Sequence, residues 1–78
     1  MHLSELSPGV RATILGVIDQ SDADPIATRL RDLGFVAGEA VSLVGHGPFG
    51  AEPLLVQIGF TRFALRRSEA ARVEVAHG

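Results

Sequence analysis

The sequence predicts a mainly β fold over residues 1–78, namely a small five-stranded SH3-like barrel with one short inserted α-helix. Short apolar segments alternate with the two-residue period of half-buried strands, turns containing Gly and Pro separate them, and one apolar stripe has helical spacing. Five short strands in so small a chain favour a partly closed barrel, because closure protects strand edges. An open five-stranded sheet with the helix on one face would bury the same side chains.

The first elements are a docked segment and a strand. Leu3 and Leu6 are three residues apart before a Pro-Gly turn, which indicates a short segment that covers one end of the core. Residues 12–18 alternate as a strand, with Ile14 and Ile18 on one face and Leu15 on the other.

A helix follows a polar linker at residues 19–23. Asp24 is predicted to cap the helix, and Pro25 suits its first position. Gly34 is expected to end the helix in a left-handed conformation, so that the next residue packs back on the last turn. The predicted buried stripe consists of Ile26, Leu30 and Leu33, and the residue after the cap is Phe35.

The second half of the sequence predicts a hairpin and two further strands. Residues 40–44 and 54–58 predict strands, and the Gly- and Pro-rich residues 45–53 predict the loop between them. Gly59 marks a tight turn. Three segments follow it: a strand in which Thr61, Phe63 and Leu65 face the core, one helical turn at residues 67–70, and a last strand around Val73 and Val75.

Composition excludes several classes of chemistry. The chain has no Cys, which excludes disulfides, thiol nucleophiles and cysteine-based metal sites, and it has no Lys for Schiff-base formation. Its net charge of −2 disfavours nucleic acid as a partner. No segment approaches the roughly 20 apolar residues of a membrane-spanning helix. We therefore expect a cytoplasmic protein, and the lack of a local Ser, His and acid motif predicts that it is not an enzyme.

Two local patterns in the sequence resemble ligand sites. Residues 45–50 match G-x-G-x-x-G, but they lead to Pro53 and a strand instead of a helix N-terminus, so a hairpin loop is the better interpretation. The three histidines, His2, His46 and His77, lack chelating spacing, and we commit to no metal site or cofactor. A surface ion bridging two molecules would need a carboxylate such as Glu5, Asp22 or Glu52.

Two sets of side chains are candidates for an exposed contact surface. The segment from residue 58 onward has a net charge of +2, from Arg62, Arg66, Arg67 and Arg72 against two acids. It is either a solvated face or a contact for an acidic partner or anionic lipid. The apolar outer positions Leu15, Val17, Val44 and Leu55 are either covered by the helix or N-terminal segment, or exposed for a partner or self-association.

Four segments in register resemble the FeoA family. They are LSELSPG at residues 3–9, LRDLGFVAG at 30–38, PFGAEP at 48–53, and ALRRSEA at 64–70 followed by VEV at 73–75. The resemblance covers essentially the whole chain. It implies a small cytoplasmic SH3-like protein without enzymatic activity that supports FeoB, the membrane transporter of ferrous iron. Phe60 departs from the small or polar turn residues frequent in that family, and it puts an aromatic ring at a hairpin tip.

The resulting functional hypothesis is an accessory protein that binds the cytosolic region of FeoB. The candidate contact residues are Pro48, Phe49, Leu54, Leu55, Arg62, Arg66 and Arg67. The alternative is a freestanding regulatory module that binds a metal ion or a peptide, similar to the SH3-like domain of metal-dependent repressors. The missing Tyr and Trp disfavour a conventional proline-peptide groove.

Overall fold

The computed structural model describes residues 1–49 and 52–77, except for the side chain of Phe49. In chain order the elements are the 3-10 helix η1 (Leu3–Glu5), β1 (Arg11–Val17), α1 (Pro25–Leu33), β2 (Ala40–Phe49), β3 (Glu52–Ile58), β4 (Thr61–Leu65), α2 (Arg67–Ala70) and β5 (Val73–His77). The number and order of the strands, the inserted helix and the helical turn at residues 67–70 agree with the predicted elements, whereas β2 and β3 are longer than predicted.

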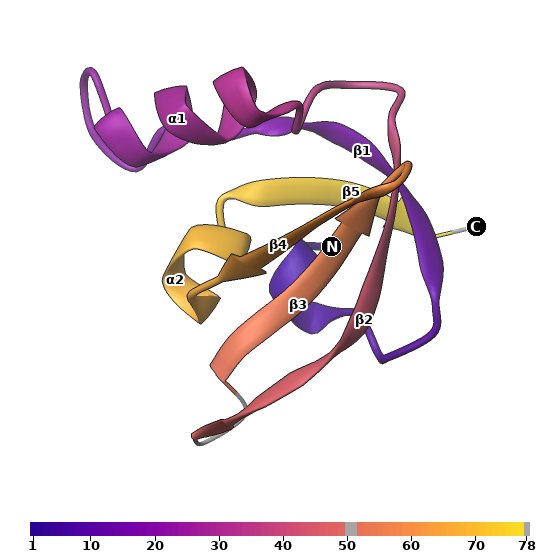
Figure 1. The fold of residues 1–78 in the computed structure, drawn as a ribbon. Coiled ribbons are helices and arrows are strands. Elements are labelled where there is room, and N and C mark those ends of the chain that lie inside the picture. Colours follow the sequence, from indigo (N-terminus) through magenta and orange to yellow (C-terminus); the bar gives the residue numbers. More distant parts are fainter. Residues whose placement is uncertain (50–51, 78) are drawn as a thin grey trace.

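The five strands form one antiparallel sheet in the order β4-β3-β2-β1-β5. The sheet curls on itself, so that β1 and β5 lie across the core from the layer of β2, β3 and β4 (Figure 1). The helix η1 contacts α2 and β5, and α2 contacts β3, so these two short helices lie at the open side between the edge strands. The fold is therefore the predicted partly closed SH3-like barrel.

One apolar core fills the barrel. Phe35 is completely buried, and its ring centre lies 5.2 Å from that of Phe63. Both leucines of the N-terminal segment are buried as predicted. The other buried apolar residues are Ala12, Ile14, Ala27, Leu30, Val41, Leu43, Leu54, Val56, Leu65, Ala70, Val73 and Val75.

The helix α1 begins and ends where the sequence predicts. The Asp24 carboxylate accepts hydrogen bonds from the backbone N–H groups of Ile26 and Ala27. Gly34 has φ of 114°, and the N–H of Phe35 donates to the carbonyl of Leu30 at 3.1 Å, which is the predicted Schellman closure.

The predicted stripe of α1 is wrong at its last position. Leu33 is 38 % exposed, whereas Ala27 is fully buried. The reason is the closure at Gly34, which turns the chain inward one residue later. Phe35, directly after the cap, is completely buried in the core.

The predicted faces of β1 are wrong at its C-terminal end, because the strand contains a β-bulge. Ile14 pairs with Val75 and Gly16 with Glu74, so two steps along β1 match one step along β5. The extra residue reverses the alternation beyond it. Val17 therefore packs against the core, and Ile18, predicted to face inward, is 45 % exposed.

The predicted loop at residues 45–53 is mostly strand. β2 continues to Phe49 and β3 already begins at Glu52. Gly47 makes this pairing possible, because a Cβ atom there would lie 2.6 Å from the Glu52 carbonyl oxygen and would collide with the Pro53 ring. A glycine that suggested a turn instead permits close backbone approach. The resulting β2–β3 hairpin extends away from the rest of the barrel (Figure 1).

Candidate contact surface

The outer face of β2, β3 and β4 carries an exposed apolar strip, formed by Val44, Leu55 and Ala64. Leu55 pairs with Ala64 on one side and with Gly45 on the other. A register shift between Leu43 and Gly45 places Val44 in a bulge opposite Leu55. Val44 is 38 % exposed and Leu55 is 37 % exposed. These two side chains are therefore exposed on the outer face of the sheet.

Two arginines border this strip along β4. Arg62, Ala64 and Arg66 alternate onto the outer face, while Phe63 and Leu65 pack inward as predicted. Thr61, predicted to face the core, is exposed at the strand end next to the turn. The Nε of Arg62 donates to Oε1 of Gln57 at 2.9 Å, which orients the guanidinium across the sheet.

The Arg66 guanidinium makes no hydrogen bond or ion pair with any residue in the described part of the chain. Its backbone N–H donates to the Glu69 carboxylate at 2.7 Å, and this bond caps the start of α2. The side chain of Arg66 is exposed. The structure thus brings together three of the predicted contact residues, Leu55, Arg62 and Arg66.

The remaining predicted contact residues are placed differently. Pro48 is exposed near the end of β2, away from the strip. Leu54 is fully buried, and its prediction as a contact is wrong, because alternation along β3 turns Leu54 inward and Leu55 outward. The side chain of Phe49 lies outside the described part of the structure.

Arg67 is exposed but takes part in tertiary contacts. Its Nη1 donates to the Ser4 carbonyl at 3.1 Å, and its backbone N–H donates to Oε1 of Glu52 at 2.6 Å. These bonds connect α2 to η1 and to the start of β3. Arg67 therefore helps to hold the open side of the barrel.

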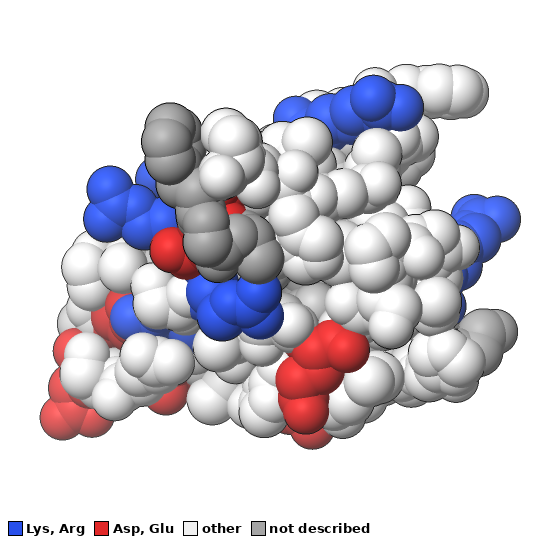
Figure 2. Space-filling model, turned by 90° about the horizontal axis from the view of Figure 1, so that it is seen from below, with Lys and Arg blue, Asp and Glu red and all other residues white. Residues whose placement is uncertain are grey.

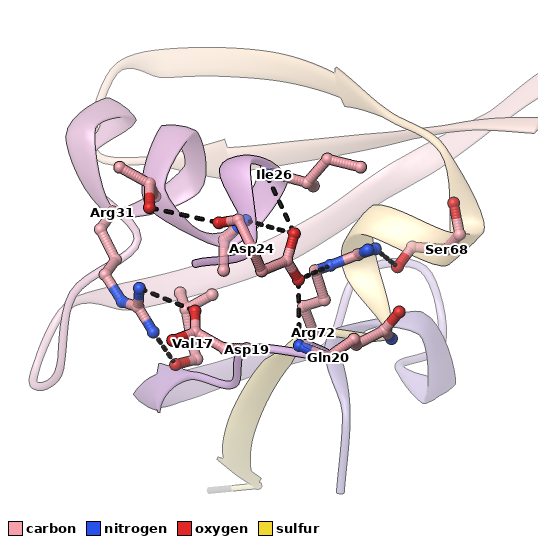
Figure 3. A network of polar contacts seen from close by, with 10 residues as sticks. Val17, Asp19, Gln20, Asp24, Ile26, Arg31, Ser68 and Arg72 are labelled. Carbon is pink, nitrogen blue, oxygen red and sulfur yellow. Dashed lines mark hydrogen bonds and ion pairs between the residues drawn. The ribbon is translucent and has the colours of Figure 1, made fainter. Parts of the chain in front are cut away.

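Arg72, counted in the basic segment, is not part of a surface patch. It is buried, and its Nε donates to Oδ2 of Asp24 at 2.7 Å (Figure 3). Its Nη1 donates to the Ser68 carbonyl at 2.7 Å. Figure 2 shows basic side chains in several separate places around a largely uncharged surface. The residues that the structure describes therefore form no single basic patch on that face.

Asp24 is the centre of this buried network. Besides Arg72 and the first-turn N–H groups of α1, it accepts a hydrogen bond from the backbone N–H of Gln20 at 3.0 Å. The pKa of the Asp24 carboxyl is lowered to about 2, first because Arg72 donates to it and second because Gln20 does. Nearby, Arg31 bonds to the Val17 carbonyl and to Asp19, which holds the linker against α1 (Figure 3).

The histidines do not converge. The Nδ1 atom of His2 lies 3.3 Å from Oε1 of Glu5 at the N-terminus, His46 lies in β2 opposite Leu54, and His77 ends β5 opposite Ala12. Among the described residues, no group of three or more His, Cys, Asp or Glu could hold a metal ion. Within the same residues, no helix has the length and apolar character needed to cross a membrane.

Comparisons with known proteins identify the family. The family model for the FeoA domain matches residues 1–77. A comparison with curated proteins finds no match. A FeoA from Stenotrophomonas maltophilia, solved with zinc, is 59 % identical with a TM-score of 0.91, covering 97 % of this chain and 89 % of that one. It is described as an SH3 domain protein and a candidate activating factor of bacterial ferrous iron transport.

Two further solved structures have the same fold. The iron(II) transport protein A of Clostridium thermocellum is 34 % identical with a TM-score of 0.83, over 99 % of this chain and 45 % of that one. A manganese-dependent transcriptional repressor shares the fold, with 19 % identity and a TM-score of 0.79 over 99 % of this chain and 41 % of the repressor. The match along residues 1–77 and the 59 % identity show that this chain belongs to the FeoA family.

Proposed function

We propose that this chain is a non-enzymatic accessory protein of ferrous iron transport that acts in the cytoplasm by binding the cytosolic region of FeoB. The observation that carries the proposal is the outer strip, where Leu55 is exposed between Arg62 and Arg66 on a member of the FeoA family. An apolar centre with cationic margins suits a protein partner, because apolar burial supplies affinity and charge supplies orientation.

Binding alone would not regulate a transporter. A partner shifts a conformational equilibrium only if it binds one state more tightly than the other. We therefore propose that the chain has preferential affinity for one assembly or conformational state of FeoB. The proposal assigns no resident metal or cofactor, and it treats any divalent ion at His2, His46 or His77 as a surface ligand.

The test is co-purification of the full chain with the detergent-solubilised FeoB of the same organism, with and without guanine nucleotide. Wild type is compared with Leu55→Asp and Arg66→Glu. The matched controls are Ile18→Asp, at an apolar residue that is 45 % exposed beyond β1, and Arg29→Glu, at an exposed arginine of α1. The experiment is repeated with a chelator to exclude bridging by metal ions.

We expect saturable binding by wild type and by both controls, and weak binding by the two strip variants. Circular dichroism and thermal unfolding verify that all four variants are folded. Absence of binding by folded wild type under every nucleotide condition would contradict the proposal. It would favour the freestanding regulatory module, which is then tested by titration with divalent ions.

A further inference from the structure

A row of four polar side chains crosses the outer face of the sheet beside the apolar strip. The strand register places Arg11 of β1 opposite Ser42 of β2, Ser42 opposite Gln57 of β3, and Gln57 opposite Arg62 of β4. Three strand spacings of about 4.8 Å separate the backbones of the two arginines, or roughly 14 Å. The row therefore has a guanidinium at each end and neutral hydrogen-bonding groups in its middle.

A hollow of about 390 Å³ lies over the part of this row formed by Arg11, Ser42 and Gln57. It is lined by Arg11, Glu39, Ala40, Ser42, Gln57 and Gly59. Its lining is more polar than apolar, so it suits a polar segment better than an apolar side chain. Phe60 follows Gly59 at the tip of the β3–β4 turn and is fully exposed.

The two arginines retain donors for a ligand. Among the residues that the structure describes, the Arg62 guanidinium donates through its Nε alone, to Gln57, whose amide nitrogen in turn donates to the Gly59 carbonyl at 2.8 Å. The Arg11 guanidinium makes no hydrogen bond or ion pair with any residue that the structure describes. Because a guanidinium has five N–H donors in a planar fork, both ends of the row can bind a carboxylate.

We propose that this row binds an extended acidic segment of a protein partner, in which two carboxylates four residues apart pair with Arg11 and Arg62. An extended chain advances about 3.4 Å per residue, so four residues span the same roughly 14 Å. The backbone between the two acids would lie over Ser42 and Gln57, and an apolar side chain of the partner would contact Phe60. The inference deepens the proposed function and rests on it, because it specifies what the partner of this surface presents.

An extended segment fits better than a helix. A helix is about 10–12 Å wide and its backbone groups are bonded internally, so it would leave the hydroxyl of Ser42 without a backbone partner. Glu39 lines the same hollow and disfavours a densely anionic surface such as a lipid bilayer. A peptide that carries two separated carboxylates avoids most of that repulsion.

The direct test is an NMR titration of the full ¹⁵N-labelled chain with acetyl-Ser-Glu-Thr-Val-Thr-Glu-Ser-amide. We expect saturable amide shifts at Arg11, Ser42, Gln57, Gly59 and Arg62. The same peptide with Gln in place of both Glu residues should bind at least severalfold more weakly. A peptide with the two acids adjacent should also be weaker, because it cannot reach both arginines.

Variants separate the site from general charge attraction. Arg11→Gln and Arg62→Gln should each raise the Kd about two- to fivefold, and the double variant by about the product of the two. Arg29→Gln in α1 should leave the Kd unchanged. Equal weakening by Arg29→Gln, shifts located elsewhere, or no saturable shifts at millimolar peptide would overturn the proposal. So would tight binding of phosphatidylglycerol vesicles that competes with the peptide.

Co-purification with FeoB distinguishes this inference from the function on which it rests. If wild type binds FeoB and the double variant Arg11→Gln/Arg62→Gln binds equally well, the acidic-segment site is wrong and the accessory function stands. If wild type does not bind FeoB, the accessory function fails, and the peptide titration alone decides whether the row binds acidic segments.

Discussion

The Nε atom of Arg72 lies 2.7 Å from Oδ2 of Asp24, although the two residues are 48 positions apart in the sequence. Both side chains are almost fully buried. The same carboxylate caps α1, so one ion pair connects the start of the helix to the residue before β5. A buried charge without its partner is costly, because neither water nor an opposite charge then stabilises it.

Arg72→Met should therefore lower the melting temperature clearly more than Arg29→Met does. Arg29 is the matched control, because its ion pair with Glu69 is long, at 4.0 Å, and its side chain is 72 % exposed. Thermal unfolding followed by circular dichroism provides the comparison. Equal melting temperatures for the two variants would show that the Arg72–Asp24 pair does not stabilise the fold.

The acid stability of the protein should depend on Asp24. Its pKa is lowered in the folded state from 3.8 to about 2, so the stability that it contributes is fully present above about pH 4 and is lost as the pH falls toward 2. Asp24→Asn keeps a capping side chain but removes this titration. Urea unfolding at a series of pH values should give a shallower slope for the variant between pH 4 and 2.

Glu5 titrates in the same direction, because the backbone N–H of His2 donates to its carboxylate and lowers its pKa. Glu5→Gln is therefore the control in that series. Glu5→Gln should remove the part of the pH dependence of stability that Glu5 contributes and leave the part that Asp24 contributes unchanged. A pH dependence identical to wild type in Asp24→Asn would refute the assignment.

Core packing of α1 predicts unequal effects for two leucines of the same helix. Leu30→Ala should destabilise the fold by about 2–5 kcal/mol through the cavity it leaves. Leu33→Ala, at a residue 38 % exposed, should change stability by less than about 1 kcal/mol. Chemical denaturation measures both. Similar losses for the two variants would mean that the helix buries the face first expected from the sequence.

The β2–β3 hairpin should tolerate a side chain at one glycine and not at another. Gly47→Ala places a Cβ against the Glu52 carbonyl and should cost about 1–3 kcal/mol through overpacking. Gly45→Ala meets no atom within 4 Å and should be nearly neutral. NMR spectra of the two variants would locate the change. An unperturbed hairpin in Gly47→Ala would contradict the close approach of the strands.

Substitutions at two adjacent residues of β3 should affect different properties, one the stability of the fold and the other the binding of FeoB. Leu54→Ala should cost about 2–5 kcal/mol, because the side chain is fully buried. Leu55→Ala should leave unfolding almost unchanged and weaken binding to FeoB. The pair of measurements, denaturation and co-purification, tests whether the strip is a contact surface. Loss of both properties in Leu55→Ala would indicate a structural role instead.

The element types are predictable from the sequence wherever the determining interaction is local. The Asp24 cap and the Gly34 closure involve neighbours within five residues, and both are confirmed. Predictions failed where a residue was added to a strand or a turn redirected the chain. Ile18 and Leu33 are exposed for those two reasons, and neither a bulge nor an exit direction is visible in a hydrophobic pattern alone.

The candidate surface was only partly predictable. Alternation in residues 61–66 correctly assigned Arg62 and Arg66 to the outer face, but the assumed loop at 45–53 made Leu54 look like a protruding contact. The sequence contains no signal that singles out Arg11, because its alignment with Arg62 across four strands depends on the strand register. No spacing within one segment indicates such a row.

The sequence by itself determined the family, the five strands, the inserted helix and its two ends, because these depend on short-range caps, turns and periodicity. Only the tertiary structure decided the burial of Arg72 against Asp24, the bulges and the Arg11-to-Arg62 row. These features depend on strand register, which is set by packing between segments distant in the chain. A shift of one residue in that packing would turn the side chains of a whole strand to the opposite face.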